Sequence, residues 1–223
     1  MFTGPFDLSI VKRAIDQQLV DITIHNLRDY SEMKNKIVDD YPFGGGGGMV
    51  MKPEPLFASI EQIKASMLQT SDTTQSTEPQ VVLLTPQGQR LTQNIAEEMS
   101  LLSDIILICG HYDGIDERVT ESLVDREISI GDYVLTGGEI PAMVLVDAII
   151  RLIPGVVGDK DSLDDDTHTS GLIQFPQYTR PQIFRGMSVP DVLLSGNHEK
   201  IRAWRERQSI ERTLKRRPDM LNT

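Results

Sequence analysis

Two glycine-containing breaks between apolar segments are the parts of this sequence best suited to hold a small ligand. The first is Gly137-Gly138, which follows a β-like apolar segment, Ile128–Leu135, and precedes an apolar helix with Pro141 in its first turn. The second lies upstream, in Cys109–Arg118 (CGHYDGIDER). Glycine between a strand and a helix lets a ligand approach main-chain groups that a side chain would screen. A lone Gly-Gly is more often an ordinary tight turn, but two such breaks predict one pocket with two walls.

Two charged stretches follow the second glycine break. Residues 158–171 (GDKDSLDDDTHTSG) are acidic and poor in apolar side chains, a composition typical of a loop with little intrinsic order. Residues 200–217 carry eight Lys and Arg side chains against Glu206 and Glu211. A basic helix of this kind is more often a solvated face than a nucleic-acid contact, and both interpretations stay open here.

The composition limits the class of protein. The formal net charge of −11 argues against a protein that coats nucleic acid without specificity. Cys109 is the single cysteine, which excludes an internal disulfide and a cysteine metal cage. We see no secretory signal at the N-terminus and no apolar stretch free enough of charge to span a membrane, and we expect a cytoplasmic protein.

The elements that position the glycine breaks follow from hydrophobic patterning. We expect helices over residues 5–18, 55–67, 92–103 and 141–153, the third of them capped by Thr92. Each should turn apolar side chains toward the core, among them Leu8 in the first and Leu102 in the third. Residues 20–26 alternate as a half-buried strand does, whereas 81–85 and 104–109 are continuous apolar strands, the first ending in a Pro86–Gln89 turn. Buried strands that alternate with amphipathic helices predict an α/β fold with a mostly parallel sheet and ligand loops at the strand ends.

The chain is expected to divide into two unequal domains. We place the α/β domain at residues 1–157, a flexible linker at 158–172 and a small helical domain at 173–223. In the small domain a short helix begins near Pro190 and ends before Gly196. A last helix over 198–215 should turn Ile201, Trp204 and Leu214 inward and its arginines outward.

A run of five glycines, Gly44–Gly48, lies in the first half of the chain. Its composition alone favours a flexible linker. Because Pro42-Phe43 precede it and Met49–Met51 follow it, an ordered backbone cradle for a phosphate or base is equally consistent. It is not a Walker-type loop, since no Gly-Lys-Ser/Thr follows.

With these segments in place, the sequence resembles the bacterial tRNA (guanine-N1)-methyltransferases of the knotted SPOUT class. The resemblance covers nearly the whole chain and rests on eight motifs in one order: DDYPFGGGGGM, TPQG, CGHYDGIDER, SIGDYVLTGGE, IPGV, QYTRP, VPDVLLSGNH and RRP. It implies a SPOUT-type, mostly parallel α/β sheet with a deep trefoil knot, plus a small helical C-terminal domain. It also implies methyl transfer from S-adenosylmethionine to N1 of guanine 37 in tRNA, beside the anticodon.

The resemblance assigns roles residue by residue. The catalytic pair would be Asp166, as the base that takes the N1 proton, and Arg151, which would stabilise charge on O6. The cofactor-binding residues would be Thr85, Pro86, Gly110, Tyr112, Asp113, Ile130, Gly131, Asp132, Tyr133, Val134, Leu135, Gly137, Gly138 and Pro141. Asp113 or Asp116 would offset the sulfonium charge. The RNA-binding residues would be Asp40, Gly45, Arg180, His198, Arg202, Arg205 and Arg216.

The partners implied are a tRNA anticodon stem-loop and a second copy of the chain, in a homodimer with a site shared between subunits. Magnesium dependence is implied by the resemblance only, and we assign no metal ligand. The alternatives are a catalytically weakened relative that binds tRNA or cofactor, and methylation of another RNA. Retention of Arg151 and Asp166 argues against the first alternative, and the matching C-terminal motifs argue against the second.

Several positions depart from the family pattern. Tyr41 stands where arginine is expected, Gly47 where proline is expected, His111 for arginine and Asp113 for glutamate. The family also usually has an apolar strand ahead of the segment that matches Met1-Phe2, so one sheet position is expected to be unfilled if that absence is real. We expect these departures to affect rate and substrate affinity more than the class of reaction.

Overall fold

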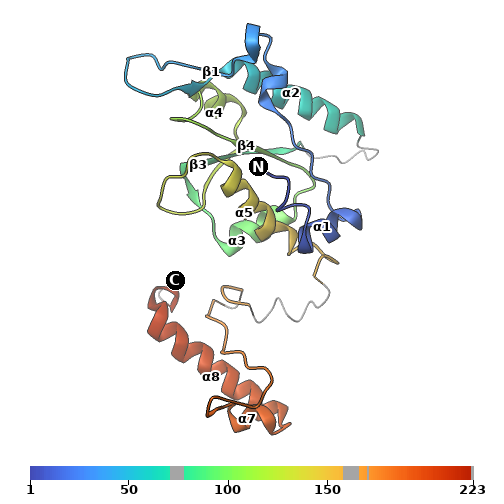
Figure 1. The fold of residues 1–223 in the computed structure, drawn as a ribbon, viewed down its shortest axis with the longest axis vertical. Coiled ribbons are helices and arrows are strands. Elements are labelled where there is room, and N and C mark those ends of the chain that lie inside the picture. Colours follow the sequence, from blue (N-terminus) through green and yellow to red (C-terminus); the bar gives the residue numbers. More distant parts are fainter. Residues whose placement is uncertain (71–77, 158–165, 170, 222–223) are drawn as a thin grey trace. The chain divides into compact units, whose positions relative to one another are not determined.

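The computed structural model describes residues 1–70, 78–157, 166–169 and 171–221, and these form two compact units that divide after Val157. Figure 1 shows the element order along the chain. No helix among the described residues has the length and apolar character needed to cross a bilayer.

The centre of the first unit is a three-stranded parallel sheet in the order β4-β3-β5. Its strands are β3 (Gln80–Arg90), β4 (Ile105–Cys109) and β5 (Arg126–Ser129). In the register, Leu84 of β3 lies opposite Cys109 on one side and Ile128 on the other. The prediction of a parallel α/β unit with buried strands at 81–85 and 104–109 is therefore confirmed.

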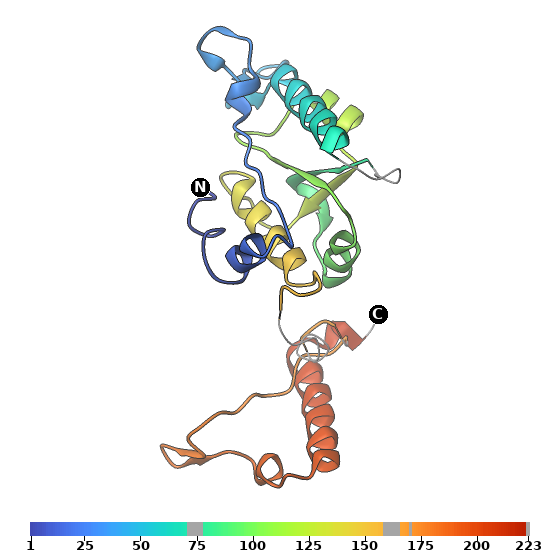
Figure 2. The ribbon, with the colours of Figure 1, turned by 90° about the vertical axis from the view of Figure 1, so that its right-hand side faces the viewer.

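Helices cover both faces of this sheet because apolar residues of β3 alternate between the faces. Val81 and Leu83 pack with α2 (Pro53–Thr70) and α4 (Glu117–Leu123). Val82 and Leu84 pack on the opposite face with α3 (Gln93–Ser100) and α5 (Glu139–Ile150). Figure 2 shows the two pairs of helices on opposite sides of the strands.

The remaining elements of the first unit lie before α2. Helix α1 (Ser9–Asp16) packs against the end of α5 in a separate apolar cluster. Two short 3-10 helices, η1 (Leu27–Tyr30) and η2 (Lys34–Lys36), precede an antiparallel pair, β1 (Asp39–Asp40) and β2 (Val50–Met51). The five glycines therefore form the tip of a hairpin, where Gly44, Gly45, Gly46 and Gly48 have positive φ angles.

The second unit contains the basic helix. It comprises a short antiparallel pair, β6 (Ile183–Phe184) and β7 (Met187–Ser188), then α7 (Asp191–Leu194), α8 (His198–Arg216) and η3 (Pro218–Leu221). Thr213 of α8 is fully buried, and its hydroxyl accepts a hydrogen bond from the main-chain N–H of Ile173 at 2.9 Å. Pro190 caps α7, and Gly196 has a positive φ of 65° just beyond its end, as predicted.

Four expectations about the elements are wrong. Residues 20–26 pair with no described strand; Val20 and Ile22 instead pack onto the α1 cluster, which explains the alternation. The Pro86–Gln89 segment is not a turn, because β3 continues to Arg90. Residues 130–135 do not continue β5, which ends at Ser129.

The fourth error concerns helix ends and inward faces. Helix α1 begins at Ser9, α3 ends at Ser100 and α5 ends at Ile150, so each is shorter than its apolar pattern predicts. Leu8, Leu102 and Leu214 were expected to point inward but are exposed. The hydroxyl of Thr92 does accept the cap hydrogen bond from Ile95 N–H, at 3.4 Å.

Candidate functional site

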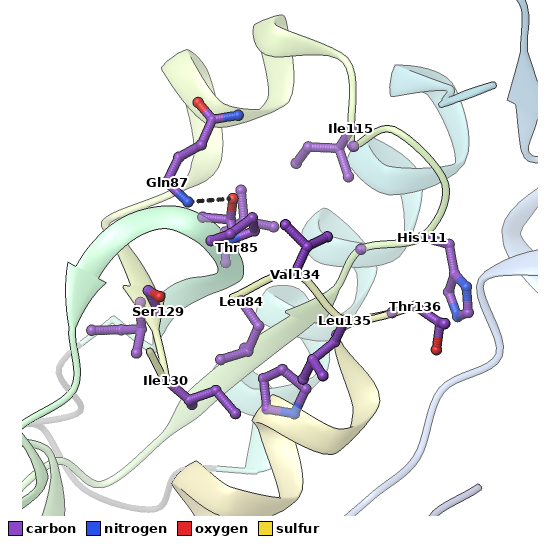
Figure 3. A pocket seen from close by; sticks show the side chains of 18 of the residues that line it. Leu84, Thr85, Gln87, His111, Ile115, Ser129, Ile130, Val134, Leu135 and Thr136 are labelled. Carbon is purple, nitrogen blue, oxygen red and sulfur yellow. Dashed lines mark hydrogen bonds between the residues drawn. The ribbon is translucent and has the colours of Figure 1, made fainter. Parts of the chain in front are cut away.

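The carboxyl ends of β3, β4 and β5 lie at one edge of the parallel sheet, and a cavity of about 320 Å³ opens there. Three loops line it: Thr85–Gln87 within β3, Gly110–Ile115 after β4, and Ile130–Gly138 after β5. Figure 3 shows side chains from all three, among them Thr85, His111 and Val134. The volume falls within the range of small-molecule sites, and loops at strand ends are where α/β folds bind ligands.

The first loop reaches the cavity because β3 bulges. Both Leu84 and Gln89 pair with Ile128, so the four residues between them leave the ladder. Thr85, Pro86 and Gln87 of this bulge line the cavity, and the Thr85 hydroxyl accepts a hydrogen bond from Gln87 N–H at 3.3 Å. The bulge therefore turns main-chain groups of β3 toward the ligand space.

The structure brings together thirteen of the fourteen positions assigned to the cofactor. They are Thr85, Pro86, Gly110, Tyr112, Asp113, Ile130, Gly131, Tyr133, Val134, Leu135, Gly137, Gly138 and Pro141. Asp132 does not line the cavity; its carboxylate lies 3.4 Å from the guanidinium of Arg90. Sequence reasoning missed nine further lining residues, although each lies close in sequence to an assigned position: Leu83, Leu84, Gln87, His111, Gly114, Ile115, Ile128, Ser129 and Thr136.

Gly138 joins the second and third loops at their closest approach. Its N–H donates to the carbonyl of Gly110 at 2.8 Å. A Cβ at this position would lie 2.6 Å from Cys109 Cα and 2.8 Å from Gly110 N. These distances are shorter than real Cβ contacts, and the main chain there cannot rotate away as a side chain does. Glycine is required at Gly138 by packing, because its own φ of −82° is open to any residue.

The two candidate acids near the second loop differ in surroundings. Asp113 is exposed and lines the cavity. Asp116 does not line it; its side chain caps α4, and hydrogen bonds from Arg118 at 2.7 and 2.8 Å hold the pKa of Asp116 below its ordinary value. Of the two acids, only Asp113 lines the cavity, and its carboxylate lies beside Gly48 of the glycine hairpin.

Cys109 ends β4 directly before the cavity. Burial, together with the charge of Glu139, raises the pKa of its thiol from 9.0 to about 12. The raised pKa favours the thiol in the folded state, so its contribution to stability is present below pH 9 and is lost as the pH rises from about 9 toward 12.

We therefore expect the Cys109 thiol to react slowly with alkylating reagents, since the thiolate is the nucleophile. At pH 8, iodoacetamide should modify the native chain at least about 100-fold more slowly than the chain in guanidinium chloride. Cys109 is the only cysteine, so the mass change reports this site alone. Equal rates in the two conditions would contradict the burial described here.

The residues assigned to catalysis lie in different units. Arg151 is the half-buried residue that caps the C-terminus of α5 in the first unit. Asp166 lies in the second unit, at the start of a turn in which its carbonyl accepts a hydrogen bond from Thr169 N–H at 3.2 Å. Most of the linker predicted at 158–172 lies outside the described residues.

The residues assigned to RNA are also distributed over both units. Asp40 is exposed in β1, and Gly45 lies at the tip of the glycine hairpin. Arg180 precedes a cis Pro181, and His198 is the first residue of α8. Arg202, Arg205 and Arg216 are exposed on α8, where the guanidinium of Arg205 lies 4.5 Å from the Phe175 ring. Arg212 was expected to point outward, but it is partly buried.

Among residues 1–70, 78–157, 166–169 and 171–221, no cluster of three His, Cys, Asp or Glu side chains is arranged to hold a metal ion.

A parallel sheet with a ligand-sized cavity at its strand ends places the first unit among the α/β domains that bind small ligands. Comparison with known families refines this class. The model of the family described as tRNA (Guanine-1)-methyltransferase TrmD matches residues 1–223, and the chain therefore belongs to this methyltransferase family. The resemblance stated from the motifs is confirmed.

Individual relatives agree with the family match. A protein named tRNA (guanine-N(1)-)-methyltransferase from Dictyoglomus turgidum is 55% identical over 99% of this chain and 85% of its own length. Proteins of the same name from Moorella thermoacetica and Staphylococcus carnosus are 53% and 55% identical, each over 99% of this chain and 86% of their own lengths.

Proposed function

We propose that this chain transfers a methyl group from S-adenosylmethionine to N1 of guanine 37 in tRNA. The observation that carries the proposal is the cavity at the ends of β3, β4 and β5, in a chain that belongs to the tRNA (guanine-1)-methyltransferase family. The relatives' names state the tRNA and guanine N1. The methyl donor and position 37 are the further steps that we add.

The cavity suits S-adenosylmethionine in shape and chemistry. Ile130, Leu135 and Pro141 line the cavity without being buried and supply apolar surface for an adenine ring. The glycine-bearing loops leave main-chain donors and acceptors unscreened, so they can pair with the edge of the base without ordering long side chains. Asp113 offers a negative charge for the sulfonium. When bound, the donor supplies an activated methyl group.

The protein must remove a proton from guanine N1, which is protonated at neutral pH. We assign this step to Asp166, whose carboxylate would take the N1 proton as the N–CH₃ bond forms. As N1 loses its proton, negative charge spreads to O6, where the guanidinium of Arg151 would stabilise it by a charge-assisted hydrogen bond until the methyl group is bound. Support for both roles is the resemblance at these positions.

We further propose a trefoil-knotted chain with the domain boundaries given above, which acts in the cytoplasm as a homodimer. In the homodimer, residues of both subunits would form each site. Arg151 of the first unit and Asp166 of the second unit could then act on the same guanine. Guanine 37 would be turned out of the anticodon loop, at modest cost because it is not paired.

The experiment that tests the proposal measures methyl incorporation from labelled S-adenosylmethionine into tRNA transcripts. One transcript carries guanine at positions 36 and 37, and its control carries adenine at 37. The proposal expects incorporation into the first transcript only. Incorporation that does not depend on guanine 37 would contradict it. Cofactor binding without incorporation would favour a relative that binds but does not catalyse.

The basic helix α8 is the proposed tRNA contact. Replacing exposed Arg202 with glutamine should weaken tRNA binding about threefold to tenfold and lower the slope of log K against log salt by about 1, as expected for one lost phosphate contact. Fluorescence anisotropy across a salt series measures both quantities. Arg13→Gln, at an exposed arginine of α1, is the control. An unchanged salt slope in the Arg202 variant would rule out this contact.

A further inference from the structure

A side-chain pair connects the second and third loops of the cavity. His111 Nε2 lies 2.5 Å from Glu139 Oε1, although the two residues are 28 positions apart in the sequence. Main-chain contacts run beside this pair: His111 forms an isolated antiparallel bridge with Gly137, and Gly138 N–H donates to Gly110. The His111–Glu139 pair and these main-chain contacts together link the second loop of the cavity to the third.

The burial of Glu139 shows that this contact is more than a surface ion pair. The Glu139 side chain is 17% exposed and that of His111 is 42% exposed. The second carboxylate oxygen, Oε2, is buried and has no hydrogen-bond partner among the described residues. A buried carboxylate that is only partly satisfied costs free energy. Its position as first residue of α5 offsets part of this cost, because the helix N-terminus favours negative charge.

The pair also fixes the space around Gly137, which lines the cavity. A Cβ on Gly137 would lie 2.6 Å from Glu139 Oε2 and 2.9 Å from His111 Cε1. Both side chains therefore pack closely against the main chain of the third loop. Their loss would leave space into which this loop can move.

The second loop is held independently on its other side. His111 N–H contacts the Met51 sulfur at 3.1 Å, and Asp113 N–H donates to the Met49 carbonyl at 3.1 Å. The contacts with Met49 and Met51 hold the second loop in place. The His111–Glu139 contact in turn holds the start of α5 and Gly137-Gly138 against the second loop. The position of the third loop, which has exposed Val134 and Leu135, therefore depends more on the His111–Glu139 contact than the position of the second loop does.

We propose that His111 and Glu139 are positioning residues that hold the second and third loops at the separation needed to bind the methyl donor. This inference rests on the proposed function, since it names the donor as the ligand. Neither side chain takes part in proton or methyl transfer. Their loss therefore changes donor affinity and leaves the rate of the bound complex nearly unchanged.

The test is a double-mutant cycle with His111→Ala, Glu139→Gln and the double variant, with the dissociation constant of S-adenosylmethionine measured by calorimetry. Each single variant should bind the donor about tenfold more weakly, and the double variant should be no weaker than either single one. The rate at saturating donor should stay within about twofold of the parent chain. Glu117→Gln, at the exposed first residue of α4, is the matched control.

A rescue variant separates positioning from a general effect on folding. Arginine at position 111 can donate two parallel hydrogen bonds to a carboxylate, which would also satisfy Glu139 Oε2. His111→Arg should therefore bind the donor at least as tightly as the parent chain. Additive losses in the cycle, unchanged donor affinity in the single variants, or weaker binding by His111→Arg would each overturn the proposal.

Hydrogen exchange gives a readout that needs no ligand. In His111→Ala the Gly138 amide, which donates to Gly110, should exchange at least about tenfold faster, while amides in the middle of α2 keep their rates. Unchanged exchange at Gly138 would overturn the proposal even if no donor binds. A parent chain that fails to bind S-adenosylmethionine but shows this faster exchange would refute the proposed function alone.

Discussion

Replacing Asp166 with asparagine will lower the rate of methyl transfer at saturating substrates by about 100- to 10,000-fold, the range expected for loss of a general base. Asparagine has nearly the same size as aspartate but cannot accept the N1 proton. Donor affinity should stay within about twofold, because the proposed role of Asp166 is to take a proton from guanine N1 and not to contact the donor. Single-turnover kinetics with labelled donor measure the rate, and calorimetry measures the affinity.

Glu206→Gln is the control for this variant. It removes one exposed carboxylate from the same unit, on helix α8, and should leave the rate nearly unchanged. If Asp166→Asn retains a rate within about threefold of the parent chain, Asp166 is not the base and the proposed proton path is wrong.

Replacing Gly138 with alanine will destabilise the first unit and abolish donor binding. The added Cβ would meet the Cys109 main chain at 2.6 Å, so β4 and the start of α5 must separate. Overpacking of this kind costs about 1–3 kcal/mol, and more where main chain must move. The same separation breaks the 2.8 Å hydrogen bond from Gly138 N–H to Gly110 and opens the cavity wall.

Urea denaturation and donor titration measure these two effects. Gly47→Ala is the matched control, because no atom lies within 4 Å of its added Cβ and its φ is not in the left-handed region. We expect its unfolding midpoint to match that of the parent chain. A Gly138→Ala variant that is equally stable and binds the donor normally would contradict the close approach of the two loops.

The central sheet could be predicted from the sequence because its signals are local. Val81–Leu84 is an uninterrupted apolar run, and the sheet buries it on both faces. Thr92 marks a helix start by its side-chain hydroxyl and Gly196 a helix end by its positive φ, and both lie where they were predicted. Errors arose where a tertiary contact overrides a local signal. Pro86 and Gly88 indicate a turn that ends the strand, but these residues form a bulge, and pairing with β5 resumes at Gln89.

The candidate site, too, could be predicted where its signals are local and not where they depend on tertiary contacts. Glycine breaks at strand ends predict the cavity, and parallel strands bring their carboxyl ends to one edge. The His111–Glu139 contact is not readable from the sequence, because it joins side chains 28 residues apart across two loops. Asp132 was predicted to line the cavity because its neighbours in sequence do. It does not line the cavity, and its carboxylate lies beside Arg90.

We propose that this chain methylates N1 of guanine 37 in tRNA. The most direct measurement is mass spectrometry of a guanine-37 transcript after reaction with S-adenosylmethionine, digested with a site-specific ribonuclease and then to nucleosides. We predict 1-methylguanosine as the methylated nucleoside, confined to the fragment that contains position 37. A different methylated nucleoside, a methyl group in another fragment, or unmodified tRNA alongside bound donor would contradict the account.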